Sequence, residues 1–599
     1  MGILIGTITS PYPNTDERIV RSAAVSVSEG TESMTTIFNL PGCCMGRVSF
    51  ARESSPEARV VRNGGSGLMW TGYITDIDRL RERLADAGTA VREGSSDAQI
   101  LFESYLKFGL TCLQGLNGLY SIAIWDETQR RFSAVTDRYG FTKIYYWLGP
   151  EGLMFASECK AILQHPKHQK GIDKEGIMNF MGAGFCFGDR TLFRDIKLIP
   201  QGCVLVYEKK KLSLKKYWDY SVKPVAGGIN EYTDKFYYHL KGALERCVNG
   251  GKNVFIPISG GLDSRTIAGI ANDCKKSIFS CTVGLSHSRD VYYGRRIGER
   301  TCVKHTVLPV SSDYIAKFGS YGVKLSEGTV TNHVFFTLRI LDFNAPPDIM
   351  VSGFIGDVLS GKNLSAGMSD SEEIKRIKFL NAFSCENLND VMDSSFKSLI
   401  GVNSEYWTRS LRSADAEAFS DKFMINALQE RQRRYAAFLI NYLGREFNAV
   451  APFADNQLMD FMMSIPSELR IQQKLYKNMI QNKLPLVADI PVDRTGKRMR
   501  STWWSWRWEN LKRMVPDNIK RKFRTADSRN WVVDCNDAIR TGSAPYFRDL
   551  FSDREHMAGL FKTDAVERLF RAHMERRVSE YHKLCAIATI IEWRRQFGV

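Results

Sequence analysis

The chain has 599 residues, 44% hydrophobic and 25% charged, which is the composition of an ordinary globular protein long enough for several domains. No uninterrupted apolar stretch approaches the roughly 20 residues that a membrane span needs, and the thirteen cysteines show no paired Cys-x-x-Cys spacing. The net charge of +16 would suit an anionic partner, but the basic residues are dispersed and no nucleic-acid motif accompanies them. We therefore expect a cytoplasmic protein with reduced thiols, a solvated basic surface, no integral membrane segment and no nucleic-acid partner.

Short strands dominate the first part of the chain. Runs of β type at 118–125, 131–135 and 143–148 are separated by turn residues, and the pattern over 77–87 predicts a helix. The stretch 221–229 contains Pro and Gly residues and is typical of a linker. We expect one domain over residues 1–215 and a second over 230–599.

Helices and strands alternate in the second part. The sequence predicts helices over 230–249, 264–272 and 291–301, and strands over 253–258, 277–283 and 305–310. This alternation indicates a doubly wound parallel sheet, whose ligand is expected beyond the carboxyl ends of the strands. Beyond residue 360 the chain is expected to be mainly helical, with an amphipathic closing helix over 584–597.

A glycine-rich loop lies between the first predicted strand and helix of this sheet. Residues 254–264 read Val-Phe-Ile-Pro-Ile-Ser-Gly-Gly-Leu-Asp-Ser. Two glycines let the backbone approach phosphates, and loop amides and a helix N-terminus supply positive potential. The loop resembles the PP-loop of ATP pyrophosphatases, which implies ATP binding by Ser259, Gly260, Gly261, Leu262, Asp263 and Ser264, with Asp263 as a Mg²⁺ ligand.

Several further blocks, in the right order, resemble asparagine synthetase-type enzymes over nearly the whole chain. In the first half the matching segments are 70–80, 96–99, 116–126, 137–147 and 155–162. The resemblance implies an N-terminal-nucleophile-type αββα sandwich followed by an adenine-nucleotide α-hydrolase-like doubly wound sheet with a helical C-terminal part.

The first half departs from that family where its glutaminase chemistry would be. The family needs a Cys after the initiator Met, whose thiol attacks the glutamine amide; Gly2 stands there instead. Thr71 and Tyr73 replace the Asn and Glu of the glutaminase segment, and Cys43 and Cys44 are interpreted as ordinary thiols. We expect no glutamine hydrolysis and a scaffold role for this half.

The second half keeps the family's synthetase motifs. Val351–Gly361 resembles the second loop of the family, which implies that Asp357 joins Asp263 on Mg²⁺ and that Gly353 lies at the nucleotide. Residues 280–283, including Thr282 and Val283, would lie against adenine. Asp455, in Val450–Asp455, is interpreted as structural.

Two lysines follow in blocks that resemble the end of the family's active site. Lys497 lies where the family has its essential lysine, which implies stabilisation of negative charge on pyrophosphate and on the acyl-transfer intermediate. Lys477 would bind phosphate nearby. A solvated surface role is the alternative for both side chains.

The resemblance implies that a carboxylate attacks Mg-ATP, pyrophosphate leaves, and an amine captures the acyl-adenylate. Without a glutaminase Cys, the amine is expected to come from the substrate, as in β-lactam synthetases and lasso-peptide cyclases. The lactam enzymes place a Tyr where Phe354 stands, and a peptide N-terminal amine, of pKa ~8, needs less help from a base. This favours a lasso-peptide macrolactam cyclase of antibiotic biosynthesis; a lactam synthetase, another glutamine-independent amide ligase and a silent scaffold remain alternatives.

A tryptophan-rich, basic stretch follows Lys497. It contains Trp503, Trp504, Trp506 and Trp508, followed by six Lys or Arg residues over 512–524. Aromatic and cationic side chains of this kind could grip a peptide substrate or a leader-processing protease partner. A helix with one Trp face and one solvated basic face explains the pattern equally well.

Overall fold

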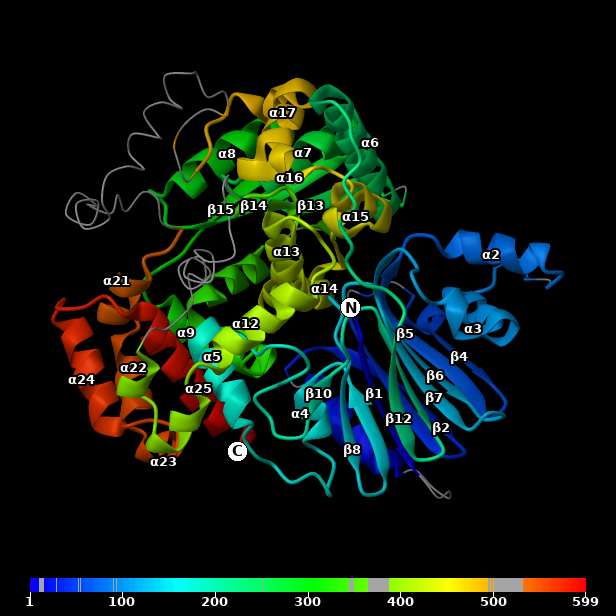
Figure 1. The fold of residues 1–599 in the computed structure, drawn as a ribbon, viewed down its shortest axis with the longest axis horizontal. Coiled ribbons are helices and arrows are strands. Elements are labelled where there is room, and N and C mark those ends of the chain that lie inside the picture. The colour runs from blue at the N-terminus through cyan, green and yellow to red at the C-terminus, as the bar shows by residue number, and fades with distance from the viewer. Residues whose placement is uncertain are drawn as a thin grey trace.

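The computed structural model describes residues 1–599 except 10–15, 29, 52, 54, 90, 93, 250, 344–348, 365–386, 494, 495, 497, 498 and 500–531. Two antiparallel sheets and one parallel sheet make up the strands of the described residues. Figure 1 shows the antiparallel sheets stacked against each other, with the parallel sheet and most of the helices beside them.

The two antiparallel sheets form the N-terminal sandwich, residues 1–216. The first sheet has the order β10-β8-β9-β1-β3-β2 and the second β12-β11-β7-β6-β5-β4. Their strands are β1 (Ile3–Thr9), β2 (Ser33–Leu40), β3 (Cys43–Phe50), β4 (Val60–Asn63), β5 (Ser66–Ile74), β6 (Gly118–Asp126), β7 (Arg131–Thr136), β8 (Tyr145–Gly149), β9 (Gly152–Ala156), β10 (Lys197–Leu198), β11 (Cys203–Glu208) and β12 (Lys211–Lys216).

Apolar side chains alternate across both sheets and fill three layers. Leu4 and Met45 of the first sheet pack against Trp125 and Phe132 of the second. The outer faces are covered by helices, α2 and α3 on one side and α1 on the other. The helices of this part are α1 (Glu17–Ser28), α2 (Ile77–Asp86), α3 (Asp97–Phe108), α4 (Cys159–Ile162) and α5 (Lys174–Ala183). The expected αββα sandwich is therefore confirmed.

The parallel sheet has the order β15-β14-β13-β16-β17, and every adjacent pair in it is parallel. Its strands are β13 (Asn253–Pro257), β14 (Ser277–Gly284), β15 (Lys304–Pro309), β16 (Ile349–Val351) and β17 (Ala449–Val450). Consecutive strands pair on one side of β13, whereas β16 pairs on its other side, so the order reverses at β13. The loop after β13 thus lies at the switch point, as expected for a doubly wound sheet.

Helices make up most of the rest of the C-terminal part, residues 229–599, and Figure 1 shows the last of them gathered at one end of the molecule. They are α6 (Ile229–Val248), α7 (Leu262–Asp273), α8 (Arg289–Thr301), α9 (Tyr314–Ser326), α10 (Gly356–Leu359), α12 (Val402–Ser413), α13 (Phe419–Asn426), α14 (Ala437–Phe447), α15 (Asn456–Met463), α16 (Ser467–Arg470), α17 (Lys474–Lys483), α18 (Pro485–Ala488), α21 (Cys535–Arg540), α22 (Ala544–Ser552), α23 (Arg554–Met557), α24 (Thr563–Met574) and α25 (Tyr581–Phe597). A π-helical stretch, Ala427–Ala436, joins α13 to α14. In the described part of the chain, no helix is long and apolar enough to span a membrane.

Candidate active site

The Ser259–Ser264 loop connects β13 to α7, and its own polar groups hold it in shape. The Ser259 amide donates to Ser264 Oγ at 2.9 Å, and the Gly261 amide donates to Ser259 Oγ at 3.2 Å. The Gly260 amide donates to Asp290 Oδ1 at 2.8 Å. A phosphate bound here would compete with Asp290 for that amide, so this aspartate, which no sequence motif indicated, lies at the candidate site.

Asp263 and Asp357 lie on two loops that touch each other. Asp263 is in the first turn of α7, and Asp357 is in the first turn of α10, just after β16. A Cβ atom at Gly353 would lie 2.9 Å from Asp263 Cβ, and one at Gly356 would lie 2.9 Å from Asp263 Cγ. Only glycine at these two positions lets the loops approach so closely. The joint binding of Mg²⁺ by the two carboxylates stays a prediction.

The two carboxyl groups have different surroundings. Burial, and then the charge of Asp357, raise the pKa of Asp263 to about 8. Burial also opposes ionisation of Asp357, but Lys362, whose Nζ lies 2.8 Å from Asp357 Oδ2, brings the pKa of that carboxyl below its ordinary value. Among the described residues, Asp263 Oδ1 is buried and has no hydrogen-bond partner.

These residues fit a magnesium ion. An unpartnered, buried carboxylate oxygen beside a second carboxylate is a site that a divalent cation would neutralise. Within the described ranges there is no cluster of three or more His, Cys, Asp or Glu side chains that could hold a metal. Two carboxylates suit Mg²⁺, which keeps water and takes phosphate oxygens as its other ligands.

Arg265 ties the loop to the segment that leads toward Lys497. Its side chain is fully buried and donates to the carbonyls of Gly260 at 2.8 Å, Ile490 at 2.5 Å and Pro491 at 2.9 Å. A Cβ atom at Gly260 would lie 2.8 Å from Asp493 Cβ, so the segment passes directly over the loop. The sequence did not indicate this role, because a buried arginine within a helix pattern cannot be distinguished from a surface one.

The remaining predicted site residues are placed as follows. Thr282 is buried in β14 and donates to the Ile258 carbonyl at 2.7 Å, while Val283 follows it in the strand. Lys477, in α17, donates to the Gln472 carbonyl at 2.8 Å. Lys497 and the tryptophan-rich stretch lie outside the described residues. The roles assigned to these side chains stay predictions.

The N-terminal sandwich makes hydrogen bonds to the loop after β17, which lies beside the carboxylate pair. Asn117 Nδ2 donates to Asp455 Oδ2 at 2.7 Å, and Asn117 Oδ1 accepts from the Asn456 amide at 2.8 Å. The Ala451 amide donates to Tyr73 Oη at 3.0 Å. Asp455 also accepts from two amides at the start of α15, so it caps that helix, which agrees with its interpretation as a structural residue.

The same loop reaches the carboxylate pair through an aromatic ring. A Cβ atom at Gly356 would lie 2.9 Å from Phe453 Cε2, and the Phe453 ring packs edge-on against Tyr476, with centroids 6.1 Å apart. Burial, and then the charge of Asp263, raise the pKa of Tyr476 well above its ordinary value. The contacts from Asn117 to Asp263 are thus continuous through packed side chains.

The position of the missing nucleophile has no room for a side chain. A Cβ atom at Gly2 would lie 2.7 Å from both Arg47 Nη2 and the Val48 carbonyl oxygen. Arg47 is fully buried, is paired with Glu53 and donates to the Trp70 carbonyl at 2.8 Å. Cys43 and Cys44 are buried in β3, and burial raises the pKa of both thiols, which agrees with their interpretation as ordinary core residues.

Comparison with known proteins agrees with this arrangement. A family model described as a glutamine amidotransferase domain matches residues 53–218, and one described as asparagine synthase matches residues 235–330 and 445–595. Together the two matches, one in each half of the chain, support an asparagine synthetase-type family for this protein.

Individual relatives are distant. Asparagine synthetase [glutamine-hydrolyzing] 3 of Bacillus subtilis is 23% identical over 72% of this chain and 74% of its own length. Amidase chry2 of Gibberella zeae is 25% identical over 47% of this chain and 38% of its own. Asparagine synthetase [glutamine-hydrolyzing] 1 of Bacillus subtilis is 25% identical over 38% of this chain and 37% of its own. The chain thus spans about three quarters of the first relative and less than two fifths of the other two.

Proposed function

We propose that this protein is an ATP-dependent, AMP-forming carbon–nitrogen ligase that closes a macrolactam ring in a peptide. A carboxylate oxygen of the peptide attacks the α-phosphorus of ATP, and pyrophosphate leaves. The peptide's N-terminal amine then attacks the acyl carbon, loses a proton, and AMP leaves. The net change in the peptide is the loss of one water.

The adenylation step rests on the Asp263–Asp357 pair. Asp263 has a buried, unpartnered oxygen at the start of a helix that follows a glycine loop, and Asp357 lies across from it. Mg²⁺ held by these two groups would supply electrostatic stabilisation of the leaving pyrophosphate. The relatives named as asparagine synthetases and amidases support an amide-bond-forming activity.

Gly2 and Phe354 bear on which amine the site would use. Because Gly2 carries no nucleophile and has no space for one, ammonia from glutamine is not the amine that the site would use. Phe354 cannot take a proton, and its ring packs on Phe141 of the N-terminal sandwich, with centroids 4.9 Å apart. An amine that is partly deprotonated at neutral pH, such as a peptide N-terminus, suits such a site.

The experiment is pyrophosphate release from Mg-ATP by the purified full chain, with mass spectrometry of each mixture. The substrates are linear peptides with an N-terminal Gly and an Asp or Glu at ring distance, a β-amino acid, and aspartate with ammonia. Pyrophosphate release together with a peptide lighter by one water is expected. Release only with the small acids would favour a lactam or other amide synthetase, and no release with any substrate would favour a scaffold.

Asp263→Ala is the matched control, because it should abolish pyrophosphate release with every substrate. Release that persists in this variant would contradict the metal assignment. The peptide substrate, the leader-processing protease partner, the cytoplasmic location and the division into domains at residues 215 and 230 remain part of this proposal.

A further inference from the structure

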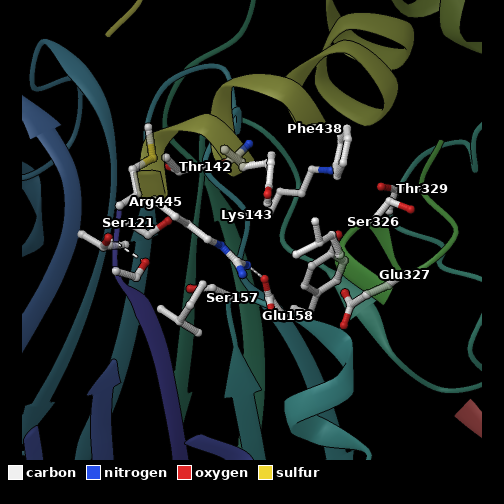
Figure 2. A pocket seen from close by; sticks show the side chains of 18 residues that line it. Ser121, Thr142, Lys143, Ser157, Glu158, Ser326, Glu327, Thr329, Phe438 and Arg445 are labelled. Atoms are coloured by element: carbon white, nitrogen blue, oxygen red, sulfur yellow. Dashed lines mark hydrogen bonds and ion pairs between the residues drawn. The ribbon is translucent and has the colours of Figure 1, made fainter. Parts of the chain in front are cut away.

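A cavity lies between the N-terminal sandwich and the C-terminal part, and no residue of the Ser259–Ser264 loop lines it. Its volume is about 70 Å³. Figure 2 shows Lys143 and Glu158 of the sandwich facing the same space as Ser326, Phe438 and Arg445 of the C-terminal part. Any molecule bound in this cavity would therefore touch both halves of the protein.

The two carboxylates that line this cavity already have partners. Glu158 lies 2.6 Å from Lys160 Nζ and is also paired with Arg445. Glu327 accepts from the amides of Cys159 at 2.9 Å and Lys160 at 2.6 Å. Both carboxylates are thus already engaged, and Glu327 only partly offsets the effects that lower the pKa of Lys143.

Within the described residues, Lys143 has no such carboxylate partner. Its ammonium group donates to the Arg434 carbonyl at 3.4 Å, and within the described residues it makes no ion pair. Burial, followed by the charges of Arg434 and Arg433, lowers the pKa of Lys143 to about 7. A buried cation in this situation is stabilised by an anion.

Further polar atoms at the cavity also lack partners. Among the described residues, Ser121 Oγ and Ser326 Oγ are buried without a hydrogen bond. A smaller cavity of about 10 Å³ shares Glu327 and Thr329 with the first, and it is lined by Arg434, whose Nη1 is likewise unpartnered. Because buried polar atoms are almost always satisfied, these atoms indicate an occupant that donates or accepts hydrogen bonds.

The rest of the wall sets the size and polarity of the occupant. Ile3, Leu325 and Phe438 give the cavity an apolar side. At about 10–15 Å³ for each water-sized occupant, the volume holds roughly five to seven non-hydrogen atoms. We propose that this interdomain cavity binds a small carboxylate of two to four carbons, with its carboxylate at Lys143 and its short apolar tail against the apolar wall.

Isothermal titration calorimetry of the full chain with acetate, propionate and butyrate tests this proposal. Propionamide, which has the shape of propionate without its charge, is the matched ligand control. Saturable binding of a carboxylate and at least tenfold weaker binding of propionamide are expected. Lys143→Met should weaken carboxylate binding at least tenfold, and Lys223→Met, at an exposed lysine, should leave it unchanged.

Lys143→Met is expected to fold, because it removes a buried charge that lacks an ion pair. Ser326→Leu gives a second, independent variant, since it fills the cavity without changing its charge and should also abolish binding. Absence of saturable binding in the wild-type protein would mean that the cavity holds water only. Binding that survives both Lys143→Met and Ser326→Leu would place the ligand elsewhere, and either result overturns the proposal.

Discussion

Replacement of Asn117 by alanine should loosen the contact between the N-terminal sandwich and the loop after β17. The Asn117 side chain is 6% exposed and makes one hydrogen bond to Asp455 and one from the Asn456 amide. A bond to a charged group contributes about 1.5–3 kcal/mol, and a buried amide left unpaired costs about 1–3 kcal/mol. We expect Asn117→Ala to lower the free energy of unfolding by roughly 3 kcal/mol.

The backbone contacts of Asn117 should survive, which makes the effect specific to the side chain. The Asn117 amide donates to Asp76 Oδ1, and its carbonyl accepts from the Thr75 amide. Asn117→Asp keeps the acceptor for the Asn456 amide but places a second carboxylate against Asp455. It should therefore destabilise at least as much as Asn117→Ala at neutral pH, and less at a pH where one carboxyl is protonated.

Urea unfolding followed by tryptophan fluorescence measures the change, and hydrogen exchange of the Asn456 amide locates it. Asn482→Ala is the matched control, because Asn482 is exposed on α17 and, among the described residues, its side chain bonds only to Asn478, at 3.3 Å. The control should stay within about 0.5 kcal/mol of the wild type. A loss below about 1 kcal/mol for Asn117→Ala, with unchanged exchange at Asn456, would refute the reasoning.

Three further predictions concern the sites. The metal-free protein should lose stability as pH rises from about 4 toward 8, since the pKa of Asp263 is raised in the folded state to about 8. Mg²⁺ affinity should rise over the same pH interval. Asp263→Asn should flatten the pH dependence of urea unfolding, and a slope that this variant leaves unchanged would contradict the assignment. Gly2→Cys should not produce glutaminase activity and should destabilise the fold, because the new Cβ would lie 2.7 Å from Arg47 Nη2. Release of glutamate from glutamine by this variant would show that position 2 accommodates a working nucleophile. Arg265→Lys should destabilise by about 2–3 kcal/mol despite keeping the charge, because an ammonium cannot reproduce the five carbonyl contacts of the guanidinium. A change within about 0.5 kcal/mol in urea unfolding would argue against the role given to this side chain.

Local sequence patterns closely identified the secondary structure around the Ser259–Ser264 loop. The predicted strand over 253–258 is observed as Asn253–Pro257, and the predicted helix over 264–272 as Leu262–Asp273. The strand expected over 143–148 instead runs over Tyr145–Gly149, and Lys143 lies in the irregular segment before it and lines the cavity between the two parts of the chain. The π-helical stretch Ala427–Ala436 had no signal, since its periodicity differs little from that of an ordinary helix over ten residues.

The sequence by itself determined which loops we propose as the site, because glycines at a strand end and the acidic residues after them are local features. It thereby selected Asp263, Asp357 and Gly353, and it also indicated the loss of the nucleophile at Gly2. Only the tertiary structure decided how these loops are held. Each of three hydrogen bonds joins residues that are distant in the chain. They run from Arg265 to the Ile490 carbonyl, from Asn117 to Asp455, and from Lys143 to the Arg434 carbonyl. Such contacts leave no local pattern, because what defines them is burial and the direction of a side chain, and both are fixed only when the halves pack together.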